Sequence, residues 1–284
     1  NLTEYEDWKK TDTRGWSIKY YKGLGTSNNK EAKEYFKNMN LIKYNWTDKS
    51  NSAIDLAFNK KRADDRKKWL MAYNRNSILD YVDPEVSYEE FIHKELIHFS
   101  NSDLERSIPN IMDGFKESLR KIFFACIKKK LTSEIKVAQL AGYVSEQTSY
   151  HHGEASLQQA IIGLAQNYVG SNNINLLVPN GQFGTRIFQG KDAAAPRYIF
   201  THLNEIVKTI FKEDDFGILN YLNDEGVSIE PEYYVPILPM ILINGSIGIG
   251  TGFSTTIPSY DPRDVVTILF KIIDAIKDSD NEFF

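Results

Sequence analysis

The feature that most constrains the fold is a run of helix-like segments that ends in a glycine-rich turn. Within residues 112–168, apolar side chains recur with the 3.6-residue helical period at Leu119, Ile122, Phe123, Cys126 and Ile127. A strand is expected at residues 174–178 and a glycine-tipped hairpin at residues 179–184. Helices followed by such a hairpin are the outline of a winged helix, which can bind either DNA or another protein.

The first hundred residues predict a second region. A strand at residues 16–21 and a helix capped by Asn28 or Asn29 form a βα unit whose partner strands are expected upstream. Residues 53–73 read as a cation-rich helix and residues 75–86 as a linker. The pattern Ser-Tyr-Glu-Glu at residues 87–90 is a capping box that opens a helix over residues 91–99.

The last third predicts shorter elements. Four consecutive apolar residues, 240–243, indicate a buried strand, and residues 245–252 indicate a glycine-rich loop. A final helix is expected from Pro262, because proline is favoured at the first helical position.

Composition is that of a globular protein, with 42% hydrophobic and 25% charged residues. The single cysteine, Cys126, excludes an internal disulfide and favours a reducing compartment. The longest apolar runs are too short to cross a membrane. The net charge of −4 argues against a nucleic-acid binder, but residues 1–200 carry an excess of Lys and Arg, which allows a basic surface. With no initiator Met, the chain is expected to be part of a longer protein.

Several common sites are missing. The sequence has no P-loop and no paired CxxC motif. The run Gly248-Ile-Gly-Thr-Gly252 imitates a dinucleotide fingerprint, but Phe253 stands where the third glycine belongs. A structural role is favoured over metal binding for His151, His152 and Glu154.

Seven motifs in a fixed order are more specific than any of these patterns, and together they resemble eukaryotic type II DNA topoisomerases of the type IIA class. The resemblance covers the chain from about residue 4 to about residue 277. The motifs are Tyr21-Lys-Gly-Leu-Gly-Thr-Ser27, Tyr150-His-His-Gly-Glu154, Gly170-Ser-Asn-Asn173, Gly181-Gln-Phe-Gly-Thr-Arg186, Gly190-Lys-Asp192, Pro196-Arg-Tyr-Ile199 and Ile243-Asn-Gly245 with Gly248–Gly252.

The resemblance implies an α+β fold built around a winged-helix domain. Residues 1–45 would be the tail of an α/β metal-binding TOPRIM domain, and residues 46–86 a connecting helix and linker. Residues 87–235 would form the winged-helix domain, and residues 236–284 would begin an α/β tower domain.

The resemblance also implies a catalytic centre. Tyr198 matches the tyrosine that attacks a phosphodiester and becomes joined to the 5′ end of the broken strand. Arg197 matches the cation that stabilises the transition state at the scissile phosphate. His152 matches a histidine that hydrogen-bonds near that phosphate, with phosphate binding favoured over proton transfer.

Further positions match family residues that touch DNA. Ile249 matches an isoleucine that wedges between base pairs and bends the duplex. The family usually has Lys-Pro-Gly-Gln where this chain has Lys116-Glu-Ser-Leu119, which adds a negative charge near DNA. The other implied contacts are Arg66, Lys67, Arg106, Lys116, Arg120, Tyr150 and Ser156.

The implied enzyme is an ATP-dependent, homodimeric, nuclear topoisomerase that acts on double-stranded DNA. Its Mg²⁺ would be held by acids of a Glu-Gly-Asp and an Asp-x-Asp motif of the TOPRIM domain. Residues 1–45 would be only the tail of that domain, so no metal ligand is expected here. The chain alone is therefore expected to be inactive. Two alternatives stay open: an inert winged-helix DNA-binding module, and a meiotic-recombination relative, which would lack the Gly248–Gly252 loop.

Overall fold

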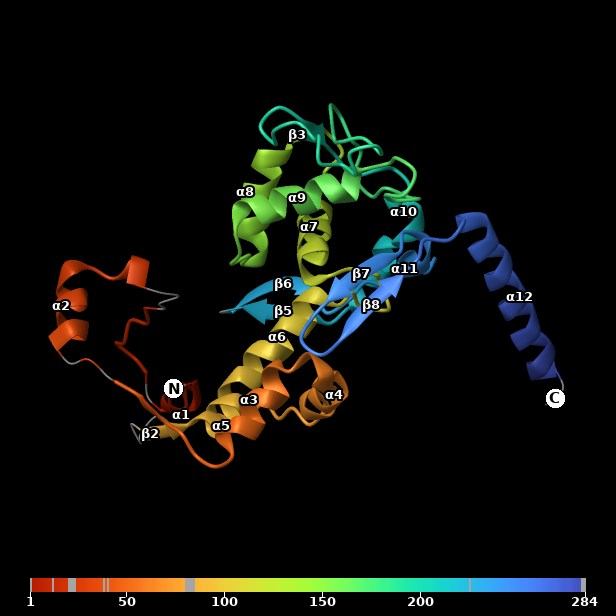
Figure 1. Cartoon of the computed structure of the whole chain (residues 1–284). Helices are drawn as coiled ribbons and strands as arrows, with labels where there is room; N and C mark the ends of the chain where they lie inside the picture. The colour runs from red at the N-terminus through yellow and green to blue at the C-terminus, as the bar shows by residue number, and fades with distance from the viewer. Residues whose placement is uncertain are drawn as a thin grey trace. The chain divides into compact units, whose positions relative to one another are not determined.

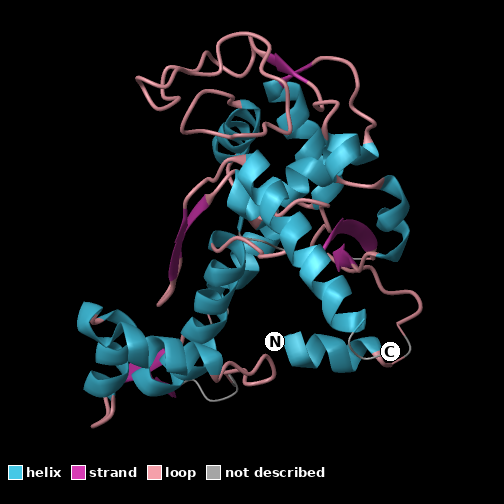
Figure 2. Cartoon of the chain, turned by 90° about the vertical axis from the view of Figure 1, so that its right-hand side faces the viewer, coloured by secondary structure: helices cyan, strands magenta, loops and turns pink. Residues whose placement is uncertain are grey.

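The computed structural model describes residues 2–11, 13–19, 24–37, 39, 41–79, 85–224 and 226–281. The chain divides into two compact units, Asn1–Phe99 and Ser100–Phe284. Helices are the main regular structure of the described chain, and its strands occur as short two-stranded pieces (Figure 1, Figure 2). The predicted α+β class is confirmed. None of the described helices combines the length and apolar character needed to span a membrane.

Unit 1 is mainly helical, with one parallel pair in which β1 (Lys43–Asn45) lies beside β2 (Glu85–Ser87). Its helices are α1 (Leu2–Lys9), α2 (Asn29–Lys37), α3 (Ser50–Phe58), α4 (Ala63–Met71), α5 (Tyr88–Phe91) and the start of α6 (Ile97–Ser107), with 3₁₀ turns at Leu24–Thr26 and Lys60–Arg62 and a π-helical turn at Ile92–Leu96.

Local capping signals in unit 1 are confirmed. The Asn28 side chain accepts from the amides of Lys30 and Glu31, both at 3.0 Å, and so caps α2. Ser87 and Glu90 form the reciprocal capping box at α5. The predicted helix over 53–73 is broken, because at Asn59 the backbone turns extended (φ −73°, ψ 120°) between α3 and α4. Of the predicted strand at 16–21, residues 16–19 are not in a strand, and 20 and 21 lie outside the described residues.

Three helices form the body of unit 2: α7 (Glu117–Lys128), α8 (Val137–Thr148) and α9 (Glu154–Ala165). Each contacts the other two (Figure 1). α7 begins with Glu117 and ends with Lys128, charges that match the two ends of the helix dipole. The 3.6-residue spacing that predicted a helix over Leu119–Ile127 is confirmed by α7.

The segment of unit 2 in which a strand and a glycine-tipped hairpin were predicted, residues 174–184, is irregular. β3 (Ile135–Lys136) pairs antiparallel with β4 (Phe200–Thr201), and single bridges join Leu177 to Leu203 and Asn180 to Phe200. The predicted strand at 174–178 is therefore reduced to one bridge. Glycine and asparagine residues on either side of it, within 170–173 and 180–184, favour turns over a continuous ladder.

Two apolar clusters hold unit 2 together. One lies among α7, α8 and α9 and includes Cys126 and Ile161, both fully buried. The other contains Phe123, Phe211 and Tyr234, with the rings of Phe123 and Phe211 4.5 Å apart. α7 supplies residues to both clusters, which explains why it is buried on more than one face.

The remaining elements follow α10 (Val207–Ile210) and a 3₁₀ turn at Glu213–Ile218. β5 (Tyr221–Asp224) and β6 (Val227–Pro231) form one antiparallel hairpin, and β7 (Ser246–Ile249) and β8 (Ser254–Ile257) form another. The predicted strand at 240–243 is wrong, because these residues form a helix, α11 (Met240–Ile243). The predicted loop at 245–252 is largely the β7–β8 hairpin. The final helix, α12 (Pro262–Asn281), begins at Pro262 as predicted.

Candidate active site

Tyr198 lies at the surface on a loop that is anchored on both sides. Its side chain is 66% exposed, whereas the next residue, Ile199, is 1% exposed and packs in the core. α8 has no side-chain N-cap, and the loop provides acceptors instead. The carbonyl of Ile199 accepts from the Val137 amide at 3.0 Å, and the carbonyl of Pro196 accepts from the Ala138 amide at 3.1 Å. The phenol is therefore exposed on a backbone fixed to a helix end.

A cation lies directly against this phenol. The guanidinium carbon of Arg197 is 4.9 Å from the centre of the Tyr198 ring, a cation–π distance. A guanidinium offers paired donors that match phosphate oxygens. The two residues that the sequence placed together are therefore side by side and both exposed.

The loop before Tyr198 is held closed by Asp192. Its two carboxylate oxygens accept from the amide and the hydroxyl of Thr185, each at 2.8 Å. The Thr185 amide is the main cause of a lowered pKa for Asp192. The chain also passes itself very closely here, because a Cβ on Gly184 would lie 2.5 Å from Gly190 Cα. Only glycine fits at that crossing.

The turn between α8 and α9 carries Tyr150 and His152, and Ser156 follows in α9. The rings of Tyr150 and His152 meet edge to face with centres 5.4 Å apart. Burial raises the pKa of Tyr150, Glu117 raises it further, and the positive charge of Arg106 lowers it. Ser156 is exposed in the first turn of α9. His152 and Tyr198 are carried by different loops of the unit.

A buried ion pair supports this turn. The Lys121 ammonium donates to Glu230 Oε1 at 2.6 Å and to the carbonyl of Thr148, the last residue of α8, at 2.8 Å. The side chains of Lys121 and Glu230 are 6% and 1% exposed. Burial nonetheless raises the pKa of Glu230 above its ordinary value, against the opposing effect of Lys121. His151 Nε2 lies 3.5 Å from Asp224 Oδ2, so the β5–β6 hairpin contacts the turn at a second point.

Arg106 and Ile249 are joined by one carboxylate. Asp103 on α6 pairs with Arg106 at 3.2 Å and accepts from Thr251 in the turn after β7. Ile249, at the end of β7, is 77% exposed. Asp103 therefore bonds both Arg106, a predicted phosphate contact, and the turn next to Ile249, the predicted wedge.

Two predicted DNA contacts do not fit their surroundings. Arg120 is 8% exposed, and its guanidinium binds the fully buried Asp113 at 2.7 and 3.1 Å. Arg66 is 9% exposed and donates to the backbone carbonyls of Leu56 and Asn59. Both guanidinium groups satisfy internal acceptors, so neither is proposed as a DNA contact.

The two predicted lysines are more accessible. Lys116 is half-buried and occupies the N-cap position of α7. Lys67, in unit 1, is 42% exposed and pairs with Asp64 at 3.0 Å. A surface pair of this kind is weak and does not prevent a phosphate from binding.

Two family models together match almost the whole chain. Residues 106–281 match the DNA gyrase/topoisomerase IV family, in its A-type subunit, and residues 1–104 match the C-terminal associated domain of TOPRIM. The chain belongs to the type IIA DNA topoisomerase family. The boundary between the two matches falls within α6.

Individual members of the family are closely similar. DNA topoisomerase 2 of Arabidopsis thaliana is 53% identical over 97% of this chain, and that of Saccharomyces cerevisiae is 53% identical over 94%. The chain spans 19% of the length of each of these relatives. A crystal structure of the Plasmodium falciparum topoisomerase II DNA-binding, cleavage and re-ligation domain superimposes with a TM-score of 0.81 at 52% identity. That match covers 97% of this chain and 38% of the other.

Five residues whose supporting role the sequence did not reveal hold the site of this topoisomerase-family chain. They are acids and their partners that lie behind the exposed groups: Asp103, Asp113, Glu230 and Thr251, together with Lys121, which the sequence had suggested as a phosphate contact and not as a support. One signal was available, because α7 carries apolar residues on more than one face. Charged residues inside such a helix must be paired. Glu230 is remote in sequence from Lys121, and Asp113, although seven residues from Arg120, lies in the turn before the helix, so helical spacing did not predict either pairing.

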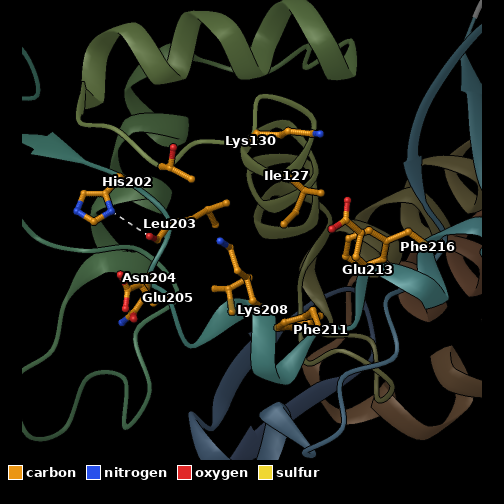
Figure 3. Close-up of a pocket in the computed structure, with 12 residues that line it drawn as sticks. Ile127, Lys130, His202, Leu203, Asn204, Glu205, Lys208, Phe211, Glu213 and Phe216 are labelled. Carbon is orange, nitrogen blue, oxygen red and sulfur yellow. Dashed lines mark hydrogen bonds between the residues drawn. The ribbon is translucent and has the colours of Figure 1, made fainter.

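The described residues also enclose a pocket of about 420 Å³ (Figure 3). Ile127, Leu203 and Phe211 contribute apolar walls, and the lining includes two lysines and two glutamates. None of the predicted site residues lines it. Its balanced charges favour no particular ligand.

Proposed function

We propose that this chain is the part of a DNA topoisomerase 2 that cuts and rejoins the DNA backbone, with Tyr198 as the nucleophile. One observation carries the proposal: an exposed tyrosine on an anchored loop with the Arg197 guanidinium 4.9 Å from its ring. A protein that only bound DNA would have no need of this pairing.

The reaction is a transesterification. The Tyr198 oxygen attacks a backbone phosphorus, the bond from phosphorus to the 3′ oxygen breaks, and the phenol proton is lost while the 3′ oxygen gains one. The product is a 5′-phosphotyrosyl link and a free 3′ hydroxyl, and the reverse step reseals the strand. Arg197 stabilises the charge that builds up on the phosphate oxygens. Because the ester bond is exchanged and not hydrolysed, resealing needs no new source of energy.

His152 is proposed to hold a phosphate oxygen by a hydrogen bond, with Tyr150 packed against its ring. Arg106, Lys116, Lys67 and Ser156 would contact the DNA backbone. Ile249 would enter the base stack, since 77% exposure of an isoleucine leaves it free to fill a gap between bases.

In the whole enzyme we propose ATP-dependent passage of one duplex through another, which relaxes supercoils and separates linked DNA. A homodimer would let each subunit cut one strand of the duplex. The enzyme would use Mg²⁺ and ATP and act in the nucleus. Among the described residues, no group of three His, Cys, Asp or Glu side chains could hold a metal ion.

The test uses the full-length protein with magnesium, ATP and supercoiled plasmid. Tyr198→Phe removes one hydroxyl and should abolish covalent DNA adducts and relaxation, while the Kd for DNA at fixed salt changes by less than about threefold. Tyr260→Phe, a second exposed tyrosine in unit 2, is the control and should behave as wild type.

Persistence of adducts in Tyr198→Phe would show that another group attacks. Wild-type protein that binds DNA without forming adducts would instead favour the inert DNA-binding module. Arg197→Lys should also lose most activity, because a single ammonium does not reproduce the paired donors of a guanidinium.

A further inference from the structure

One carboxylate in unit 2 binds two functional elements at once. Asp103 Oδ2 accepts from the amide of Thr251 at 3.0 Å and from its hydroxyl at 3.1 Å. Asp103 Oδ1 accepts from Arg106 Nη2 at 3.2 Å and from the Ser107 hydroxyl at 3.3 Å. The carboxylate side chain is only 22% exposed. Asp103 therefore links the C-terminal part of α6 to the turn that follows β7 (Figure 1).

The glycines on either side of Ile249 make this contact close. A Cβ on Gly248 would lie 2.6 Å from the carbonyl oxygen of Ser107, a backbone atom that cannot move aside. A Cβ on Gly250 would lie 2.8 Å from Leu104 Cδ2. The hairpin backbone thus rests directly on α6 and the residues after it, while the Ile249 side chain points into the open and is 77% exposed.

We propose that Asp103 is a positioning residue that holds the Ile249 wedge in register with Arg106. This inference rests on the proposed function, in which Arg106 binds the DNA backbone and Ile249 enters the base stack. An apolar wedge must resist the cost of unstacking a base step, about a few kcal/mol. On a mobile turn, the isoleucine side chain would be displaced by the base stack. A turn fixed to α6, the helix that carries Arg106, keeps the side chain in place while Arg106 binds the phosphate.

The donors from Thr251 and Arg106 allow Asp103 to fix the turn and still leave Arg106 able to bind a phosphate. Thr251 is bound through its backbone and its side chain, so the turn is fixed at two atoms. The contact with Asp103 uses one Arg106 nitrogen, and a guanidinium has five N–H donors, so others stay available for a phosphate.

The experiment measures DNA bending by end-to-end energy transfer on a doubly labelled duplex bound to the full-length protein. Ile249→Ala should reduce bending. Asp103→Ala should reduce bending by at least about half as much as Ile249→Ala does, while the Kd for DNA at fixed salt changes by less than about threefold. In the Asp103→Ala background, Ile249→Ala should reduce bending by less than it does in the wild-type background, since coupled residues are not additive.

Matched variants separate positioning from folding. Thr251→Val removes only the hydroxyl bond and should reduce bending, while Thr251→Ser keeps both donors and should restore it. Glu105→Ala is the control, because Glu105 is exposed on the same helix and bonds Asn101. The Thr251 pair still gives a result if Asp103→Ala fails to fold.

The outcomes are distinct. Unchanged bending in Ile249→Ala would overturn the wedge role that the proposed function includes. Reduced bending in Ile249→Ala, together with unchanged bending in Asp103→Ala and Thr251→Val, would leave the wedge in place and overturn the role of Asp103. Additive losses in the double variant would also overturn it.

Discussion

At the scale of single residues, three neighbouring cations on one helix have different surroundings. Lys116 is half-buried at the start of α7, whereas Arg120 and Lys121 are buried against Asp113 and Glu230. All three have the residue types of a phosphate-binding cluster. The location of the acidic partners separates the surface cation from the two interior ones. Glu230 is remote in sequence from Lys121, and Asp113 lies outside the helix that carries Arg120.

Arg120→Ala should therefore destabilise unit 2, because it leaves Asp113 charged and unpaired in the interior. The expected loss is about 3–5 kcal/mol in the free energy of unfolding, measured by urea denaturation. Arg197→Ala is the matched control: its side chain is exposed, and the expected change is below about 0.5 kcal/mol. Equal losses in the two variants would contradict the interior role of Arg120.

Glu230 gives a pH-dependent prediction. Burial raises the pKa of Glu230 above its ordinary value of 4.5, so the folded state holds this proton more firmly than the unfolded state. Its contribution to stability is then fully present below that ordinary pKa and is lost as pH rises through the raised pKa. The free energy of unfolding of wild type minus that of Glu230→Gln should fall as the pH rises from 4.5 through the raised pKa of Glu230.

Urea denaturation across this range measures the difference, with the exposed Glu232→Gln as control. A difference that grows with pH would mean that attraction to Lys121 outweighs burial.

At the scale of elements, sequence prediction succeeded where the signal was local. The Asn28 cap, the Ser87 capping box and the start of α12 depend on residues within one turn of each other. Prediction failed at residues 240–243, since a short apolar run fits a buried helix as well as a buried strand. Hairpin β7–β8 was missed because its glycines are required by the close approach to residue 107, a contact that the sequence does not reveal.

The candidate site shows the same division. The Arg197–Tyr198 pair is adjacent in sequence and was predictable from its motif. The support of Lys121 by Glu230 joins residues of α7 and β6 and depends on tertiary packing. The sequence therefore indicated the exposed catalytic side chains better than the buried residues that hold them in place.

The loop before Tyr198 should depend on Asp192. Asp192→Ala removes the acceptor for the Thr185 amide and hydroxyl, so that amide should exchange with solvent faster than in wild type. Because the pKa of Asp192 is lowered, this stabilisation is present above its ordinary pKa of 3.8 and disappears as pH falls through the lowered value.

Hydrogen exchange followed by mass spectrometry on peptides covering residues 182–194 measures the effect. Asp214→Ala, in the 3₁₀ turn at Glu213–Ile218, provides the control. Unchanged exchange in Asp192→Ala would show that the loop is held by other contacts.

At the scale of the whole molecule, the two units carry separate natural probes. All four tryptophans, Trp8, Trp16, Trp46 and Trp69, lie in unit 1, and the single cysteine, Cys126, lies in the core of unit 2. Burial raises the pKa of Cys126 to about 12, so the thiol should react with alkylating reagents only when unit 2 opens.

The two probes should report different transitions in urea. Unit 2 has two large apolar clusters, whereas buried apolar residues are fewer in the described part of unit 1. Tryptophan fluorescence should therefore change at a lower urea concentration than the one at which Cys126 becomes labelled. Coincident transitions would indicate that the two units unfold as one.

Covalent attachment at Tyr198 is tested most directly by mapping the peptide that stays linked to DNA. The full-length protein would be incubated with magnesium and an end-labelled duplex, denatured to trap the adduct, and digested with protease and nuclease before mass spectrometry. The predicted result is a nucleotide joined through its 5′ phosphate to Tyr198. Attachment to any other residue, or through a 3′ phosphate, would contradict the assignment of Tyr198 as the nucleophile.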